Sequence, residues 1–129
     1  FINADGSKPD VPRQIWTQGE TEANSCWFPT IDSPNEKMTQ EILLTVDNQF
    51  VTLSNGKLIE SKNNTDGTRT DYWRLDKPHA PYLTMIAVGE FKKVIDPNYK
   101  DFEVSYYVEP QYEKYALNIF GRTPEMIRY

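Results

Sequence analysis

Alternating apolar and polar positions predict that most of this chain forms β-strands. We expect strands over residues 41–46, 50–53, 57–61, 68–75, 82–91 and 102–108. The run over 82–91 is the most apolar, and a nearly continuous apolar run is typical of a strand buried on both faces. Residues 102–108 carry apolar side chains at every second position, which predicts one buried face. Residues 1–14 are expected to form an extended lead-in and residues 15–29 a partly buried irregular segment, because neither has a regular period.

Two turn signals divide these strands. Asn55-Gly56 is the strongest short signal for a hairpin, since both central residues of a type I′ turn need a positive φ. We therefore expect residues 50–53 and 57–61 to pair as a hairpin. A second cluster at 63–67, rich in Asn, Asp and Gly, predicts that the next strand returns beside 57–61.

The period changes to that of a helix after Pro110. Five apolar or aromatic side chains then recur at helical spacing: Tyr112, Tyr115, Ala116, Ile119 and Phe120. Gly121 is placed to end this helix, and Thr123 to cap another one that reaches the last residue after about one turn. We interpret that last helix as the truncated start of a further element. These patterns together indicate a mainly β fold, an antiparallel β-sandwich with a C-terminal helical segment.

Composition and charge exclude several classes of function. The chain has 129 residues with a net charge of −5 and no basic patch, which makes nucleic acid a poor partner. Its longest apolar run, residues 85–88, is too short to span a membrane. With one Cys and one His, the chain can form neither an internal disulfide nor a two-His zinc site. Cys26 is expected to be buried beside Trp27, and we expect neither catalytic residues nor a metal site within this chain.

Four blocks in register resemble the M1 family of zinc aminopeptidases. The first is Thr-Gln-Gly-Glu at 17–20, similar to the family's T-Q-x-E, followed by Pro-x-x-Asp-x-Pro-x-x-Lys over 29–37. The second is Ser-Asn-Gly at 54–56, and the third is a Tyr-Leu…Gly-x-Phe strand over 82–91. The last, ending in Thr-Pro-Glu-Met-Ile at 123–127, is similar to the start of the family's catalytic domain. No block is specific alone, but the four in order cover nearly the whole chain, residues 13–129.

The resemblance implies a saddle-like β domain that packs on a thermolysin-like catalytic domain in the same parent chain. Residues 1–109 would be part of that N-terminal β domain, and residues 110–129 the first helical segment of the catalytic domain. The family binds zinc through H-E-x-x-H and a downstream Glu, and this chain contains neither H-E-x-x-H nor G-x-M-E-N. Zinc would therefore be a cofactor of the parent protein and not of this chain.

Gln18 and Glu20 are the candidate substrate-binding residues that the resemblance implies. In the family, the matching Glu helps to bind the α-amino group of the peptide substrate, and the matching Gln lines the first specificity pocket. An ammonium group at the closed end of a cleft needs a carboxylate or amide oxygen as its partner. Gly19 between them allows a close approach of the backbone. The alternative is that Glu20 is one of many solvated acidic residues.

Five further motif residues are interpreted as structural. They are Asp32, Pro34, Lys37, Asn55 and Gly56. Asp32 can accept hydrogen bonds from backbone N–H groups of the following turn, which Pro34 stiffens.

The function that the resemblance implies is that of a non-catalytic part of an M1-like zinc aminopeptidase. This part would wall the active-site cleft and help to anchor the peptide N-terminus. The alternatives are a stand-alone β-sandwich module that binds a protein or a glycan, and an unrelated extracytoplasmic sandwich. An uncovered sheet edge predicts self-association. A bacterial periplasmic or other extracytoplasmic location is favoured.

Overall fold

Antiparallel strands dominate the computed structural model, which describes residues 2–3 and 5–129. Contacts divide the chain into two units, Phe1–Gly89 and Glu90–Tyr129. The predicted fold class, mainly β with a C-terminal helical segment, is confirmed. The domain boundary expected at 109/110 stays a prediction.

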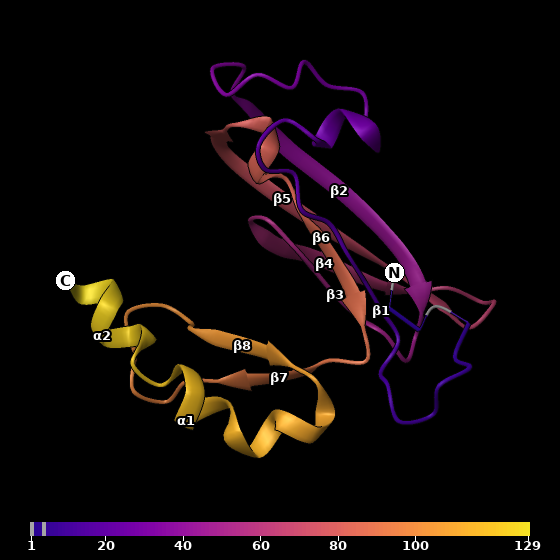
Figure 1. Ribbon diagram of the computed structural model, residues 1–129, viewed down its shortest axis with the longest axis vertical. Helices are drawn as coiled ribbons and strands as arrows, with labels where there is room; N and C mark the ends of the chain where they lie inside the picture. Colours follow the sequence, from indigo (N-terminus) through magenta and orange to yellow (C-terminus); the bar gives the residue numbers. More distant parts are fainter. Residues whose placement is uncertain (1, 4) are drawn as a thin grey trace. The chain divides into compact units, whose positions relative to one another are not determined.

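Six strands of the first unit lie in two three-stranded antiparallel sheets within the described residues. The strands are β1 (Gln14–Trp16), β2 (Met38–Asp47), β3 (Val51–Ser54), β4 (Lys57–Asn63), β5 (Thr68–His79) and β6 (Ile86–Gly89). One sheet has the order β1-β6-β3 and the other β2-β5-β4 (Figure 1). Short 3₁₀ turns, η1 (Asn24–Cys26) and η2 (Pro81–Leu83), precede β2 and β6.

Polar side chains join the two sheets of the first unit. Thr52 of β3 accepts a hydrogen bond from Trp73 Nε1 of β5 at 3.0 Å and donates one to Asp71 Oδ2 at 2.6 Å. Gln40 of β2 donates to Ser54 of β3 at 3.1 Å. All five of these side chains are buried. The two sheets therefore meet through a polar interior, in which each buried group needs its partner.

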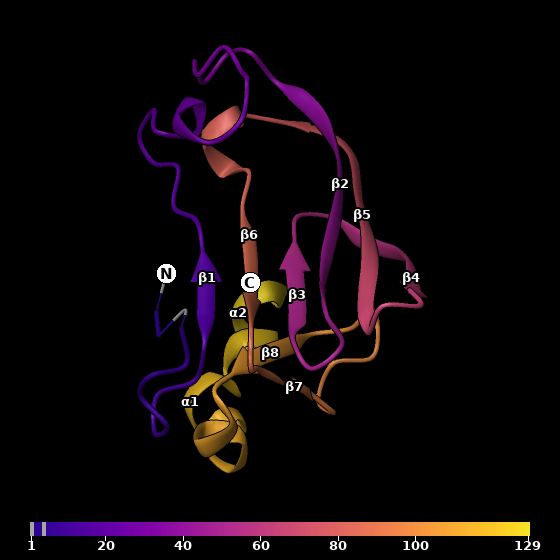
Figure 2. The same ribbon diagram turned by 90° about the vertical axis from the view of Figure 1, so that its right-hand side faces the viewer.

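The hairpin predicted at Asn55-Gly56 is wrong. Strand β3 pairs with β6, and β4 pairs with β5, so the Asn-Gly turn carries the chain from one sheet to the other (Figure 2). Gly56 has φ +88°, but Asn55 is not among the residues with positive φ, as a type I′ turn would require. The Asn55 side chain instead binds the backbone of the segment before β6. Long-range hydrogen bonds thus outweigh the local turn preference.

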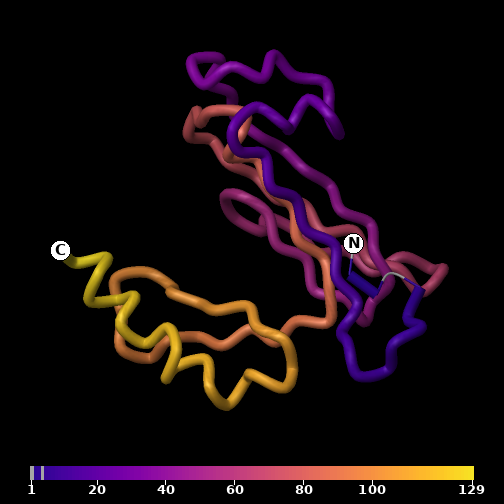
Figure 3. Tube along the Cα trace, viewed as in Figure 1, coloured from indigo at the N-terminus to yellow at the C-terminus, as the bar shows by residue number. Residues whose placement is uncertain are grey.

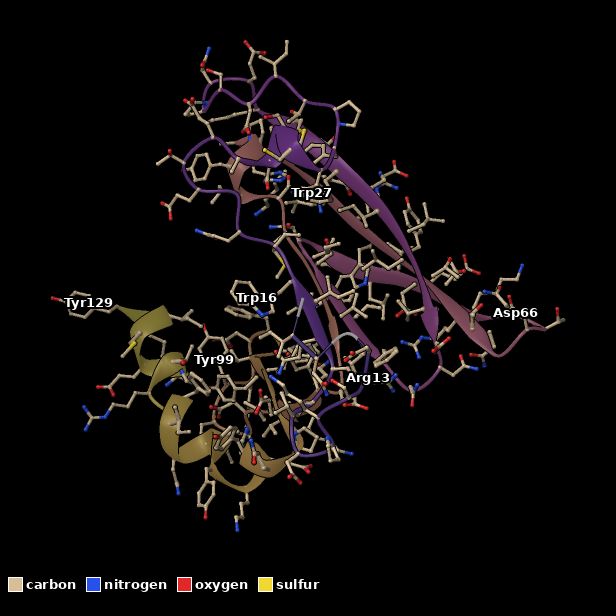
Figure 4. All side chains as sticks on the ribbon, turned by 45° about the vertical axis from the view of Figure 1, so that its right-hand side comes forward. Arg13, Trp16, Trp27, Asp66, Tyr99 and Tyr129 are labelled. Atoms are coloured by element: carbon tan, nitrogen blue, oxygen red, sulfur yellow. The ribbon has the colours of Figure 1, made fainter. Side chains whose placement is uncertain are left out.

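The hairpin predicted around residues 63–67 is confirmed by the pairing of β4 with β5. Asp66 lies at its tip (Figure 4), where Oδ1 accepts hydrogen bonds from the backbone and the hydroxyl of Thr68. Gly67 supplies the positive φ, +86°, that the tip needs.

Two other expectations for the first unit need correction. Ile15 and Trp16, expected in an irregular segment, belong to strand β1, because three residues are too few to show a period. The strand expected over 82–91 is shorter: Pro81–Leu83 is a 3₁₀ turn, and β6 covers Ile86–Gly89. Leu83 is about half exposed, so that part of the apolar run is not buried.

The second unit contains a hairpin and short helices. Its elements are β7 (Lys92–Ile95), β8 (Ser105–Val108), η3 (Pro110–Tyr115), α1 (Ala116–Phe120) and α2 (Thr123–Arg128). Val104, Tyr106, Val108 and Ala116 form its buried cluster, which confirms the alternation predicted around β8.

Two details of the second unit differ from the sequence prediction. Phe102, which shares the alternation, is more than half exposed. Thr123 does not cap α2, because Arg122 holds the N-cap position and no side chain makes a capping hydrogen bond there. Among the described residues, no helix is long and apolar enough to cross a membrane.

Candidate functional site

Gln18 and Glu20 lie directly after strand β1, at a hollow in the first unit. The hollow has a volume of about 280 Å³, and residues 17–20 line it together with residues 82–85. The Nε2 atom of Gln18 donates to Glu20 Oε2 at 3.3 Å, and both residues are exposed. The structure therefore brings the two predicted substrate-binding residues together at one concave surface.

The pairing of β1 with β6 places the two walls of this hollow, residues 17–20 and residues 82–85, side by side. The register Trp16↔Ala87 continues beyond the strand, where Thr17 N donates to Ile86 O at 3.1 Å. The Thr17 hydroxyl in turn accepts a hydrogen bond from Ile86 N at 3.1 Å. The chain trace shows the segment after β1 running alongside the segment before β6 (Figure 3).

Asn24 contacts both segments that line the hollow. Its side chain is fully buried, and Nδ2 donates to Pro81 O at 2.6 Å and to Thr84 O at 2.9 Å. On the other wall, a Cβ atom added to Gly19 would lie 2.3 Å from Asn24 Cγ. The close approach predicted at Gly19 is therefore an approach to a buried amide.

Asn55 binds the backbone of residues 82–85, which form one wall of the hollow. Its Nδ2 donates to Leu83 O at 2.9 Å, and its Oδ1 accepts from Met85 N at 2.8 Å. At Gly56 next to it, a Cβ atom would lie 2.0 Å from Arg74 O, so the position has room for glycine alone. The Ser-Asn-Gly block thus stabilises one wall of the hollow through the hydrogen bonds of Asn55.

The remaining motif residues lie away from the hollow's lining. Asp32 Oδ2 accepts a hydrogen bond from Ser25 N at 2.9 Å, so Asp32 binds η1 rather than the turn that follows it. The turn itself forms, with Glu36 N donating to Ser33 O at 3.0 Å across Pro34. Lys37 is exposed.

The lone histidine and cysteine do not join the hollow's lining. His79 Nε2 lies 3.1 Å from Gln40 Oε1 and 3.3 Å from Thr84 Oγ1, inside the first unit. Cys26 is exposed, contrary to the expectation that it would be buried. In the part of the chain that the structure describes, no three His, Cys, Asp or Glu side chains gather as a metal would require.

Sequence reasoning missed Asn24 and Thr84 as parts of this site. Both are buried polar residues whose partners are about 60 positions away in the chain. No local period marks such a residue, because a buried amide in a long-range contact looks like any exposed asparagine in the sequence. Gly19 was the available signal, because a glycine there predicts a close backbone contact. The sequence did not identify the residue that makes this contact.

Comparisons with known proteins point to one family. The family model of the Peptidase M1 N-terminal domain matches residues 5–83. Transcription initiation factor TFIID subunit 2 of Gallus gallus is 31% identical over 110 residues, which cover 84% of this chain and 9% of that protein. Endoplasmic reticulum aminopeptidase 1 of Mus musculus is 29% identical over 94 residues, covering 73% of this chain and 10% of that protein. The chain thus spans about a tenth of the length of these relatives.

A solved structure shares the fold. It is the crystal structure of Legionella pneumophila aminopeptidase A in complex with aspartic acid, with a TM-score of 0.72 and 23% sequence identity. The similarity covers 78% of this chain and 13% of that one. The family match extends over more than half of the chain and includes both walls of the hollow up to Leu83. The chain therefore belongs to the Peptidase M1 N-terminal domain family.

Proposed function

We propose that this chain is part of a zinc aminopeptidase, in which it walls the active-site cleft and anchors the N-terminus of the peptide substrate. Its partner would be the catalytic domain of the same protein, to which residues 110–129 would lead. Zinc held by that domain would supply a polarised water molecule for hydrolysis of the first peptide bond. The residues of this chain would bind and orient the substrate.

The observation that carries this proposal is the pairing of Gln18 with Glu20 at the hollow. A glutamine that donates through Nε2 to a carboxylate still offers its own Oε1 as an acceptor. The two side chains together can surround an ammonium group with oxygen atoms, and a hydrogen bond between charged groups is stronger than a neutral one. A peptide with a blocked N-terminus could not make this contact.

The experiment measures release of 4-nitroaniline from an aminoacyl-4-nitroanilide by the full-length protein with zinc. Glu20→Gln is expected to lower kcat/KM by about 10- to 100-fold, since a charge-assisted hydrogen bond is lost. Glu22→Gln is the matched control, because Glu22 is an exposed acid two positions further along. Equal effects of the two substitutions, or no zinc-dependent release by the unaltered protein, would count against the proposal.

A second candidate function rests on the 31% identity to Transcription initiation factor TFIID subunit 2. The parent protein would then be a subunit of a multiprotein assembly, and this chain a non-catalytic domain within it. This candidate predicts that the full-length protein does not hydrolyse aminoacyl-4-nitroanilides at any zinc concentration. It also predicts that Glu20→Gln and Glu22→Gln leave its assembly with partners equally unaffected.

A further inference from the structure

We propose that Asn24 is a positioning residue that holds Gln18 and Glu20 in register with the opposite wall of the hollow. The inference rests on the function proposed above. It starts from the fact that Asn24 is the buried side chain in contact with both walls: Gly19 on one side, and the carbonyl groups of Pro81 and Thr84 on the other.

The hydrogen bonds of Asn24 leave its amide one orientation. Both N–H groups of Nδ2 are used, toward Pro81 O and Thr84 O. Its Oδ1 accepts a hydrogen bond from Trp27 Nε1 at 2.7 Å. A flipped amide would place its oxygen against two carbonyl oxygens and its nitrogen against an N–H donor. The Asn24 side chain is therefore fixed in one orientation.

This rigid amide supports the backbone between the two substrate-binding side chains. Gly19 is buried, whereas Gln18 and Glu20 on either side of it are exposed. Ala23 N donates to Gly19 O at 3.0 Å, which closes the loop from Gly19 to Asn24. Movement of Asn24 would therefore move Gly19 and change the orientation of the Glu20 side chain. The orientation of a substrate-binding side chain controls how well the substrate is placed for reaction.

The two asparagines beside the hollow have separable tasks. Asn24 contacts both walls, whereas Asn55 holds Leu83 and Met85 of a single wall. Loss of Asn24 is expected to affect the contribution of Glu20 to substrate binding. A substitution that simply weakened the fold would act whether or not Glu20 is present.

A double-mutant cycle in the full-length protein tests this inference. Asn24→Asp removes both N–H donors and places a carboxylate opposite two carbonyl oxygens. We expect it to lower kcat/KM about tenfold in the unaltered background, since buried groups lose their partners. In the Glu20→Gln background we expect a change of less than about twofold, because interacting residues are not additive. An equal loss in both backgrounds would overturn the inference.

A second measurement does not depend on peptidase activity. In hydrogen–deuterium exchange, Asn24→Asp is expected to speed exchange about tenfold or more in fragments covering residues 17–23 and 80–86. The matched control is Asn48→Asp in the exposed turn before β3, which should leave both fragments unchanged. Unchanged exchange with Asn24→Asp would overturn the inference. If the unaltered protein is not a peptidase, the proposed function fails, and exchange alone decides the role of Asn24.

A milder variant covers the case in which Asn24→Asp does not fold. Trp27→Phe removes the N–H group that orients Asn24 Oδ1 and keeps a six-membered aromatic ring at a position that is 41% exposed. We expect exchange in the same two fragments to rise by about two- to fivefold. Trp16→Phe is the control, since Trp16 is also exposed, at 55%. Identical exchange with the two tryptophan substitutions would contradict the role given to Asn24.

Discussion

Arg69 and Asp71, two residues apart on β5, form a two-pronged ion pair inside the first unit. Arg69 Nε lies 2.8 Å from Asp71 Oδ1, and Nη2 lies 2.9 Å from Oδ2. Alternate residues of a strand face the same side, so the spacing itself brings them together. Ser61 of β4 and Thr52 of β3 donate to the same carboxylate at 2.6 Å each. One carboxylate therefore links two strands of one sheet to a strand of the other.

The Asp71 site predicts a loss of stability in acid. Burial acts to raise the pKa of Asp71, but hydrogen bonds from Arg69, Ser61 and Thr52 and the charge of Arg69 lower it to about 2, from an ordinary value of 3.8. A lowered pKa in the folded state gives stability that is complete above pH 4 and lost as the pH falls toward 2. The group is expected to contribute about 2 kcal/mol, lost over that range. Urea unfolding between pH 2 and pH 7 measures it.

Asp71→Asn should remove this acid-sensitive step and lower stability at pH 7. We expect a loss of about 3 kcal/mol, because Arg69, whose side chain is only 20% exposed, would lose its counter-charge. Asp76→Asn is the control, since the Arg74–Asp76 pair is largely exposed and surface pairs contribute little. The same pH profile in the unaltered and Asp71→Asn proteins would disprove the assignment.

Gly56→Ala and Gly67→Ala test close packing at fixed backbone geometry. Both glycines have a positive φ, +88° and +86°, but a Cβ atom at Gly56 would lie 2.0 Å from Arg74 O, and one at Gly67 would meet nothing within 4 Å. Gly67→Ala should cost about 1 kcal/mol for the backbone conformation alone. Gly56→Ala should cost at least about 3 kcal/mol, because the clash is with backbone. Equal midpoints in urea unfolding would contradict the structure at Gly56.

Thr52→Val tests the polar interior between the two sheets. The substitution keeps the shape but leaves Trp73 Nε1 without its acceptor and removes one of the two donors to Asp71 Oδ2, the other being Arg69 Nη2. We expect a loss of about 2 kcal/mol, since the orphaned Trp73 Nε1 belongs to a buried side chain. Thr45→Val is the matched control: Thr45 pairs with Thr70 on an exposed face, and its loss should cost less than about 1 kcal/mol. Tryptophan fluorescence during urea unfolding, to which the buried Trp73 contributes, reports the result.

Tyr106→Phe tests the second unit. The Tyr106 hydroxyl donates to Asp96 Oδ2 at 2.6 Å and lies 3.0 Å from Phe120 O, so it joins the loop after β7 to the end of α1. The hydrogen bond from Tyr106 and one from Asn98 N lower the pKa of Asp96. Tyr106→Phe should therefore lower the thermal midpoint and raise the pKa of Asp96 toward its ordinary value. Tyr112→Phe at an exposed position should change neither quantity.

Local patterns predicted the elements well where one strand turned directly into its neighbour. The β4–β5 hairpin followed from the turn residues at 63–67, and the buried face of β8 followed from its alternation. The failures occurred where partners are far apart in the chain. Asn55-Gly56 has the composition of a hairpin turn, yet its side chain binds Leu83 and Met85 about 30 positions away. A turn signal carries no information about such distant competitors.

The sequence by itself determined the mainly β class, the positions of most turns, and the resemblance that singled out Gln18 and Glu20. These depend on local spacing and on motif order, both of which can be counted along the chain. Tertiary structure alone decided which strands share a sheet and how the hollow is held. Asn24 and Asn55 donate to backbone carbonyl groups of the segment before β6, and Gly19 and Gly56 make room for close contacts. Such contacts exist only when segments distant in sequence are packed together, because buried polar groups must find partners wherever the fold places them.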